Sequence, residues 1–353
     1  MKVLHTADIH IREYNDDRWQ ALQQIIGLGK AERVDVLAIS GDLFENNANA
    51  QQLRPKLREL FADADWPVLI IPGNHDATSY PDGIFLGETV TVIRDLLAPV
   101  KIADHYFWGF PYEDLSEAEI LEYLNLAGSM AAADATHLLL FHGELLDIIG
   151  NWMHYGEEGR QRYLPVKLSY FKNHPWQYIL AGHFHSNFDV HEFDKNCYFI
   201  YPGSPVAITR REIGVRKVNL FETGKPPAAV TLETAYFDKL EIHFNPLEQD
   251  DPLQIIAEKL QDLPENVKLL LEIRGYFDGK KLNKTEQELH EAITKLTGEK
   301  CEITVMEFQD IRQILEEDLF KLFIDRLKNR DGDLAEKRDI LEVALKAFME
   351  MRT

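Results

Sequence analysis

Five short polar motifs, each directly after an apolar run, constrain this chain more than any other feature of its sequence. The apolar runs, such as residues 34–40 and 67–71, read as buried strands, and helical stretches lie between the first of them. This order predicts an α/β layer of parallel strands whose carboxyl ends meet at one edge. We therefore expect the motifs to converge. In order they are Asp8-x-His10, Gly41-Asp42, Gly73-Asn74-His75-Asp76, His142 and Gly182-His183-x-His185.

The motifs bring together two carboxylates, one amide and four or five imidazoles. A mixed set of oxygen and nitrogen donors suits Mn²⁺, Fe²⁺ or Zn²⁺ better than Ca²⁺. Since no cysteine takes part, a structural zinc site is not expected. Taken singly the motifs are weak, because a Gly-Asp pair after a strand is usually a turn and a His-x-His pair is usually structural. Five strand ends with the same chemistry together predict a metal centre.

The size and charge of the chain set limits on its function. Its 353 residues are enough for one large domain and a smaller one or two. The net charge of −21 argues against a nucleic-acid binder, which usually has a basic footprint. Two metal ions would add about four positive charges at the carboxylate cluster, and a partner could supply a basic groove. The charge therefore limits a nucleic-acid function without excluding it.

Cysteine content and hydropathy indicate the compartment. Cys197 and Cys301 are the only cysteines and do not have the spacing of a zinc site. We expect both to be reduced, which makes the cytoplasm the default location. Because no stretch of about 18 apolar residues occurs, no transmembrane helix is expected.

The later part of the chain divides into two further segments. After Cys197 the expected strands have no helices between them, so this part of the sheet is expected to be antiparallel. Residues 237–309 read as a small βαβαβ domain, with Asp251-Pro252 opening a helix and Gly298 closing another. Residues 310–353 read as two amphipathic helices separated by Asn329-Arg-Asp-Gly332. We predict domains at 1–236 and 237–309, followed by a helical tail at 310–353.

Longer stretches around the motifs identify a family. The sequence resembles the calcineurin-like metallophosphoesterase superfamily and, within it, the SbcD-type double-strand-break repair nucleases, counterparts of the Mre-type nuclease subunit. The resemblance is strongest over residues 1–222. It implies a β-sandwich of α/β type flanked by helices, a small α+β capping domain and a helical tail. It rests on Leu4-His-Thr-Ala-Asp-Ile-His10, Ser40-Gly-Asp-Leu-Phe44, Ile71-Pro-Gly-Asn-His-Asp76, Tyr201-Pro-Gly-Ser204 and Lys217-Val-Asn-Leu-Phe-Glu222.

The resemblance also implies roles for the motif residues. His75 would donate a proton to the leaving oxygen. Asp76 either orients the His75 ring or is a turn residue that binds backbone N–H groups. Two metal ions would share the Asp42 carboxylate, with one oxygen on each ion. The implied ligands are Asp8, His10, Asp42 and His185 for one ion, and Asp42, Asn74, His142 and His183 for the other.

Activity and partners follow from the same resemblance. It implies a Mn²⁺-dependent DNA nuclease with 3′-to-5′ exonuclease and single-strand or hairpin endonuclease activity. It also implies a homodimer and an SbcC/Rad-type SMC-like ATPase partner that binds the C-terminal helices. The apolar stripes of the tail could instead pack on the capping domain of the chain itself. The alternative function is a small-molecule or nucleotide phosphodiesterase or phosphatase, which the negative charge favours.

Several residues near the motifs have two readings each. After Gly-Asp-Leu-Phe44, relatives often carry a histidine where this chain has Glu45. A carboxylate there would repel a phosphodiester unless it binds water, a lysine or a metal, which leaves open the balance of exonuclease and endonuclease activity. The other reading is a solvated surface glutamate. The remaining residues are assigned either to substrate contact or to local structure: Ser204, Arg210, Arg211, Arg216, Trp152, His154 and Tyr155.

Overall fold

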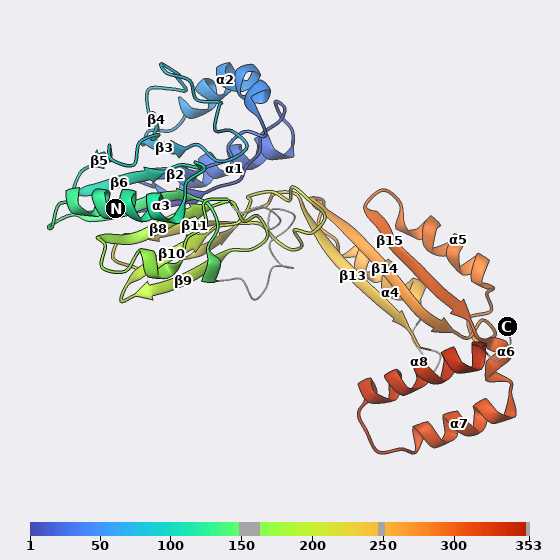
Figure 1. Cartoon of the computed structure of the whole chain (residues 1–353). Coiled ribbons are helices and arrows are strands. Elements are labelled where there is room, and N and C mark those ends of the chain that lie inside the picture. Colours follow the sequence, from blue (N-terminus) through green and yellow to red (C-terminus); the bar gives the residue numbers. More distant parts are fainter. Residues whose placement is uncertain (148–162, 246–250, 351–353) are drawn as a thin grey trace. The chain divides into compact units, whose positions relative to one another are not determined.

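The computed structural model describes residues 1–147, 163–245 and 251–350 (Figure 1). It divides into two compact units, Met1–Phe237 and Asp238–Thr353. The tail and the residues of the small βαβαβ domain therefore belong to one compact unit. Trp152, His154 and Tyr155 lie outside the described residues.

The first unit is a sandwich of two six-stranded sheets with helices on its outer faces, which confirms the predicted fold class. The first sheet has, in spatial order, β12 (Ala229–Thr231), β11 (Lys217–Glu222), β1 (Lys2–Thr6), β2 (Val36–Ser40), β3 (Val68–Ile71) and β4 (Val90–Val92). The second has β5 (Val100–Ile102), β6 (His105–Phe110), β7 (Thr136–His142), β8 (Trp176–Gly182), β10 (Cys197–Tyr201) and β9 (Asp189–Asp194).

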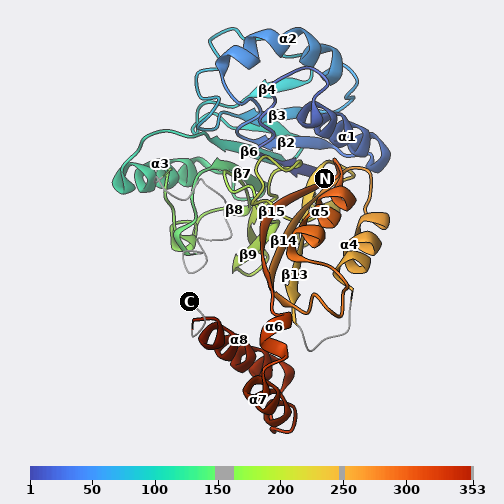
Figure 2. The same ribbon diagram turned by 90° about the vertical axis from the view of Figure 1, so that its right-hand side faces the viewer.

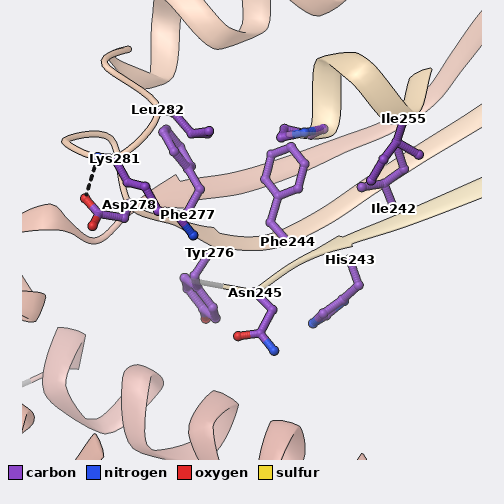
Figure 3. Close-up of a pocket in the computed structure, with 11 residues that line it drawn as sticks. Ile242, His243, Phe244, Asn245, Ile255, Tyr276, Phe277, Asp278, Lys281 and Leu282 are labelled. Carbon is purple, nitrogen blue, oxygen red and sulfur yellow. Dashed lines mark hydrogen bonds between the residues drawn. The ribbon is translucent and has the colours of Figure 1, made fainter. Parts of the chain in front are cut away.

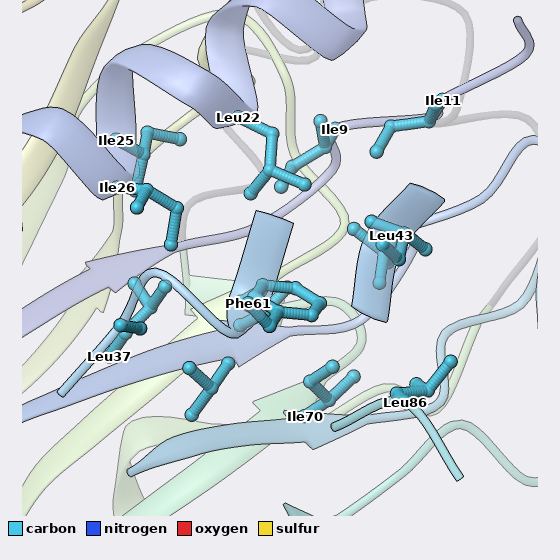
Figure 4. Close-up of a cluster of buried hydrophobic side chains, with 14 of the residues drawn as sticks. Ile9, Ile11, Leu22, Ile25, Ile26, Leu37, Leu43, Phe61, Ile70 and Leu86 are labelled. Atoms are coloured by element: carbon cyan, nitrogen blue, oxygen red, sulfur yellow. The ribbon is translucent and has the colours of Figure 1, made fainter. Parts of the chain in front are cut away.

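Three apolar clusters hold these layers together. Between the sheets, fully buried side chains such as Val36, Leu138 and Leu180 meet. Outside the first sheet, α1 (Asp17–Glu32) and α2 (Asn47–Phe61) cover a cluster that includes Leu22, Leu37 and Ile70 (Figure 4). Outside the second sheet, α3 (Glu117–Met130) and the short helix η3 (Leu168–Tyr170) cover another. Both sheets are thus buried on two faces, which explains why their central strands read as continuous apolar runs.

Strand direction brings the predicted motifs together. In the first sheet β1, β2 and β3 are parallel, and in the second β6, β7 and β8 are parallel. The motifs therefore lie at the carboxyl ends of two neighbouring sets of strands.

One expectation about direction is wrong in part. β11 pairs antiparallel with β1 and β12, as expected, but β10 pairs with β8 in parallel. The reason is β9, which the sequence analysis missed: it precedes β10, pairs with it antiparallel and reverses the chain.

The second unit is built on a three-stranded sheet in the order β13 (Tyr236–Phe244), β14 (Val267–Phe277) and β15 (Cys301–Asp310). Two helices lie on one face of it, α4 (Pro252–Gln261) and α5 (Glu286–Thr297) (Figure 2). Asp251 caps α4 ahead of a proline, and Thr285 forms a capping box with Glu288 at α5. Their order along the chain is βαβαβ.

The described part of the tail, up to residue 350, has three helices where two were expected: α6 (Arg312–Leu315), α7 (Asp318–Lys328) and α8 (Leu334–Glu350). The break at residues 329–332 falls between α7 and α8. Side chains from all three helices form a small core with Tyr276 of β14 beside it. Two apolar side chains of α7, Leu319 and Leu322, are exposed, at 63% and 50%. The tail therefore has an inner face that packs on itself and an outer face with two exposed leucines.

Among the described residues, no helix combines the length and apolar character needed to cross a membrane.

Candidate metal centre

The strand-end loops continue as a paired structure beyond the sheet. The N–H of Asp8 donates to the carbonyl oxygen of Gly41 at 3.1 Å, and the N–H of His10 donates to that of Asp42 at 2.9 Å. Further along, the N–H of Glu45 donates to the carbonyl of Ile11 at 3.2 Å. The two motifs are therefore held in fixed register by backbone bonds.

Four motif residues have left-handed backbone conformations that side chains other than glycine rarely adopt. The φ angles are 55° at Asp8, 53° at His10, 51° at Asp42 and 112° at His183. Such a conformation costs on the order of 1–3 kcal/mol per residue and persists where the surrounding structure enforces it, often at functional sites. These sharp turns direct the four side chains into one space.

The glycines of the motifs are required by close approach. A Cβ atom on Gly41 would lie 2.1 Å from Nδ1 of His142, and one on Gly73 would lie 2.2 Å from Oδ1 of Asp42. At Gly182 it would lie 2.0 Å from the carbonyl oxygen of Ser40. Because these neighbours are ring, carboxylate and backbone atoms, no larger residue fits at the three positions.

The donor atoms converge in two overlapping groups. In the first, Nε2 of His10 lies 3.3 Å from Nε2 of His185 and 3.6 Å from Oδ2 of Asp42, and Oδ1 of Asp8 lies 3.9 Å from Nε2 of His185. Ligand atoms bound to one ion at about 2.0–2.2 Å are roughly 3 Å or slightly more apart. The spacing of this group therefore fits a single ion, and all four residues are buried.

The second group shares the same carboxylate oxygen. Nε2 of His142 lies 3.4 Å from Oδ2 of Asp42 and 2.9 Å from Oδ1 of Asn74. Nδ1 of His183 lies 3.3 Å from that amide oxygen. Oδ1 of Asp42 instead accepts the backbone N–H of His75 at 2.9 Å. Oδ2 of Asp42 is thus the oxygen that both donor groups have in common in this structure.

The outward-facing ring nitrogens of the first group meet carboxylates. Nδ1 of His10 lies 3.3 Å from Oε2 of Glu45, and Nδ1 of His185 lies 3.5 Å from Oε1 of Glu212. A neutral ring that donates from Nδ1 has its lone pair on Nε2. Burial lowers the pKa of His10, which favours this neutral form. The two Nε2 lone pairs then face each other, which is repulsive unless a cation lies between them.

The second group has the same arrangement. Nδ1 of His142 lies 2.9 Å from the carbonyl oxygen of Ser40, so Nε2 is left to face the shared carboxylate and the amide oxygen of Asn74. For His183 the outer nitrogen is Nε2, which lies 3.8 Å from Oε1 of the buried Glu144, beyond hydrogen-bond distance. Imidazole rings with an oxygen near the outer nitrogen fit a divalent cation, which binds the inner nitrogen in its unprotonated form.

The pKa values of Asp42 and His142 indicate that positive charge is favourable in this site. Burial pushes the pKa of Asp42 upward, but the charges of His142 and His10 outweigh it and hold the pKa below the usual range. Burial lowers the pKa of His142, but the Asp42 carboxylate raises it further, to about 9. In the metal-free site a proton on His142 therefore supplies the charge that a bound cation would supply.

His75 and Asp76 differ in their surroundings. The half-buried His75 ring lies edge-on to the ring of His10, with 4.7 Å between centroids. Asp76 is fully buried and accepts the N–H groups of Gly73 and Phe44 and the hydroxyl of Tyr80 at 2.7–3.2 Å. Burial and the charge of the nearby Asp42 raise the pKa of Asp76 to about 6. These are the bonds of the turn residue that was one of its two readings, so Asp76 shapes the loop that carries His75.

The serine and the arginines that follow β10 differ in burial and in their contacts. Ser204 is fully buried and its hydroxyl donates to Glu212 at 2.8 Å. Arg216 is also buried, and its guanidinium donates to the carbonyl oxygens of Ser204, Ser186 and His185. Both side chains thus brace the loop that carries His185. Arg210 and Arg211 are exposed.

Glu212 contacts the candidate metal centre, and the sequence analysis did not single it out. It is 1% exposed, contacts His185, and accepts the N–H groups of Ile208 and Thr209 at 2.8 and 3.0 Å. Burial raises its pKa, but the bond to His185 and the other donors lower it to about 2. It lies 27 residues beyond His185 in a segment without a motif, so only the fold reveals its role.

A separate hollow occurs in the second unit, at one end of its sheet. Figure 3 shows Phe244, Phe277, His243, Asn245 and Lys281 among the residues that line it. Its volume of about 70 Å³ is small beside the roughly 300–1,000 Å³ of ligand sites. It has none of the metal-binding chemistry of the first unit.

Comparison with known proteins identifies the protein family of this chain. The sequence pattern of the calcineurin-like phosphoesterase family matches residues 1–200, more than half of the chain. The chain belongs to this family, which confirms the resemblance inferred from the motifs.

Two relatives of known name are similar to parts of this chain. The chain is similar to the DNA double-strand break repair protein Mre11 of Saccharolobus solfataricus, with 25% identity over 60% of this chain and 56% of that protein. It is also similar to SbcD of the SbcCD nuclease of Staphylococcus saprophyticus, with 28% identity over 34% of this chain and 36% of that protein. The matched segment thus spans little more than half the length of the first relative and about a third of the second.

Proposed function

We propose that this chain is a two-metal DNA nuclease that processes DNA ends as the nuclease subunit of a repair complex. The observation that carries the proposal is the convergence of two donor groups on one carboxylate oxygen, Oδ2 of Asp42. The relatives point to DNA, since one is named for double-strand break repair and another as part of the SbcCD nuclease.

The proposed ligand assignment follows the two groups. One ion is assigned to Asp8, His10, Asp42 and His185, and the other to Asp42, Asn74, His142 and His183. Mn²⁺ is the proposed metal, with Fe²⁺ or Zn²⁺ as alternatives, because carboxylate, amide and imidazole donors are mixed and thiolates are absent from the set. Two such ions would supply an activated water and neutralise charge on the scissile phosphodiester.

The proposed catalytic work of the protein is positioning and proton transfer. Glu45, Glu212 and the carbonyl oxygen of Ser40 hold the ring protons outward, so that the inner nitrogens remain basic. His75 is proposed to donate a proton to the leaving oxygen, because its half-buried ring sits at the edge of the first donor group. Its backbone N–H also fixes the rotation of the shared Asp42 carboxylate.

The proposed partner is an SMC-like ATPase of the SbcC/Rad type, bound through the tail. The outer face of α7 supports this proposal, because exposed leucines one helical turn apart form the kind of anchor that helix-in-groove contacts use. The net charge of −21 supports it as well, since a chain this acidic gains from a basic partner when it binds DNA. A homodimer is proposed on the resemblance alone.

A substrate comparison tests the nuclease proposal against the alternative of a small-molecule phosphodiesterase. The purified chain with Mn²⁺ is given end-labelled duplex, single-stranded and hairpin DNA, and in parallel bis(4-nitrophenyl) phosphate and cyclic nucleotides. We expect products that shorten from the 3′ end and cleavage of hairpins. Efficient turnover of cyclic nucleotides with intact DNA would assign the alternative function instead.

A further inference from the structure

Glu45 belongs to a compact ionic cluster at the edge of the metal centre. Oε1 of Glu45 accepts from the guanidinium of Arg12 at 2.9 Å, and Oε2 accepts from that of Arg18 at 2.8 Å. Oε2 also lies 3.3 Å from Nδ1 of His10. The reading of Glu45 as a solvated surface residue is therefore wrong, and its side chain is 23% exposed.

Glu45 alone would be negative, but the cluster that it forms with Arg12 and Arg18 is positive. One carboxylate is held by two guanidinium groups, which remain protonated at any pH that proteins tolerate. The three side chains together carry a net charge of about +1. Burial pushes the pKa of Glu45 upward, but hydrogen bonds from His10 and the two arginines outweigh it and hold the pKa below its usual range. The repulsion expected between Glu45 and a phosphodiester is thus replaced by attraction at this edge of the site.

The two arginines have different surroundings. Arg18 is buried, with its side chain 10% exposed, and also donates to the carbonyl oxygen of His10 at 2.6 Å. Arg12 is half exposed, at 52%, and among the described residues the bond to Glu45 uses one of its five N–H groups. Arg18 therefore supports the loop, while Arg12 presents donors to solvent.

The backbone around Arg12 is already fixed. Ile11 and Phe44 form a parallel bridge, and the N–H of Ile11 donates to Leu43 at 2.9 Å. The side-chain amide of Asn49, in the first turn of α2, donates to the carbonyl oxygen of Arg12 at 2.8 Å. Arg12 thus starts from an anchored backbone, and Glu45 orients its guanidinium, so that little freedom remains to be lost on binding an anion.

We propose that Arg12 binds a phosphate of the DNA strand next to the scissile one, with Glu45 as the residue that positions it. This inference rests on the proposed nuclease function and deepens it. Arg12 connects to the first donor group through Glu45, which holds the guanidinium at 2.9 Å through Oε1 and lies 3.3 Å from Nδ1 of the proposed ligand His10 through Oε2. The guanidinium is therefore at the edge of the metal centre, where a strand bound at the metals would continue. A planar guanidinium matches phosphate oxygens with two parallel N–H bonds, which a lysine cannot do.

The test compares Arg12→Gln and Arg12→Lys with Arg58→Gln. Arg58 is exposed in the last turn of α2, more than ten residues and roughly 18 Å of helix from the cluster, and serves as the matched control. Each protein, loaded with Mn²⁺, is assayed on an oligonucleotide and on bis(4-nitrophenyl) phosphate, which has no second phosphate. Binding to a phosphorothioate oligonucleotide is measured by fluorescence anisotropy across a salt series, and metal content is measured in parallel.

We expect Arg12→Gln to bind the oligonucleotide roughly 10- to 100-fold more weakly, the usual cost of a lost bond to a charged group. The slope of log K against log salt should fall in magnitude by about 0.7–0.9. Arg12→Lys should keep the slope but regain only part of the affinity. The loss of kcat/KM on bis(4-nitrophenyl) phosphate should be much smaller, and Arg58→Gln should match the wild type in every assay.

Two results would overturn the assignment. One is an equal loss of kcat/KM on both substrates in Arg12→Gln, which would place Arg12 at the scissile phosphate or in support of the metal. The other is oligonucleotide binding with an unchanged affinity and salt slope. Failure of the nuclease proposal looks different, because the wild-type chain itself would then turn over the small ester and leave DNA intact.

Discussion

A methyl group added at Gly182 tests whether the site depends on the close approach of the two sheets. In Gly182→Ala the new Cβ would lie 2.0 Å from the carbonyl oxygen of Ser40 and 2.7 Å from Cβ of Ala7. These contacts are with backbone and a buried methyl group, so β8 has to move away from β2. The carbonyl of Ser40 also accepts from Nδ1 of His142, and that bond lengthens when the strands separate.

The expected magnitude follows from two terms. Overpacking of a buried site costs about 1–3 kcal/mol, and a weakened buried hydrogen bond adds roughly 0.5–1.5 kcal/mol. A total of about 3 kcal/mol lowers the Tm of a unit of this size by roughly 6–12 °C. Mn²⁺ affinity should fall as well, because His142 and His183 flank the displaced strand end.

The assay is thermal and urea unfolding with and without Mn²⁺, together with calorimetric titration of the metal. The control is Gly27→Ala in α1, where a Cβ would meet nothing within 4 Å. There the exchange should stabilise the helix by up to about 1 kcal/mol and leave metal affinity unchanged. If Gly182→Ala binds Mn²⁺ normally and melts with the wild type, the close packing described for this strand end is wrong.

Three further substitutions probe separate parts of the account. His75→Asn should keep both metals and bind DNA while turnover falls roughly 10²–10⁴-fold; loss of metal would make His75 a ligand instead. Glu212→Gln should weaken Mn²⁺ binding roughly 10- to 100-fold by freeing the His185 ring, seen by titration, and an unchanged affinity would refute its role. Leu319→Gln with Leu322→Gln should leave folding and small-ester turnover intact but abolish co-purification with the ATPase; undiminished binding would remove the tail from that interface.

The parts of the fold that sequence predicts best are those in which local chemistry and periodicity agree. The apolar runs of β2 and β3 are buried on both faces, so burial shows directly in their composition. The motif residues were recognisable because each follows such a run. β9 was missed because its sequence is largely polar and only one of its residues, Phe193, is buried.

The parts that sequence could not supply depend on contacts between distant segments. Glu45 was read in isolation, but Arg12, in the loop after β1, and Arg18, in the first turn of α1, reverse the charge that it contributes. Glu212 and Arg216 carry no motif, yet both brace the loop of His185. In the tail, helical spacing identified an apolar stripe but not which of its members face inward, since that is decided by the fit between α7 and α8.

Anomalous scattering from crystals grown with Mn²⁺ tests the central claim most directly. The account predicts two peaks about 3.5–4 Å apart, on either side of Oδ2 of Asp42. The first should lie within roughly 2.0–2.3 Å of the His10 and His185 rings, and the second at the same distance from those of His142 and His183. Crystals of Asp42→Ala should show neither peak at full occupancy. A single peak away from Asp42, or two full peaks in the Asp42→Ala protein, would contradict a shared two-metal centre.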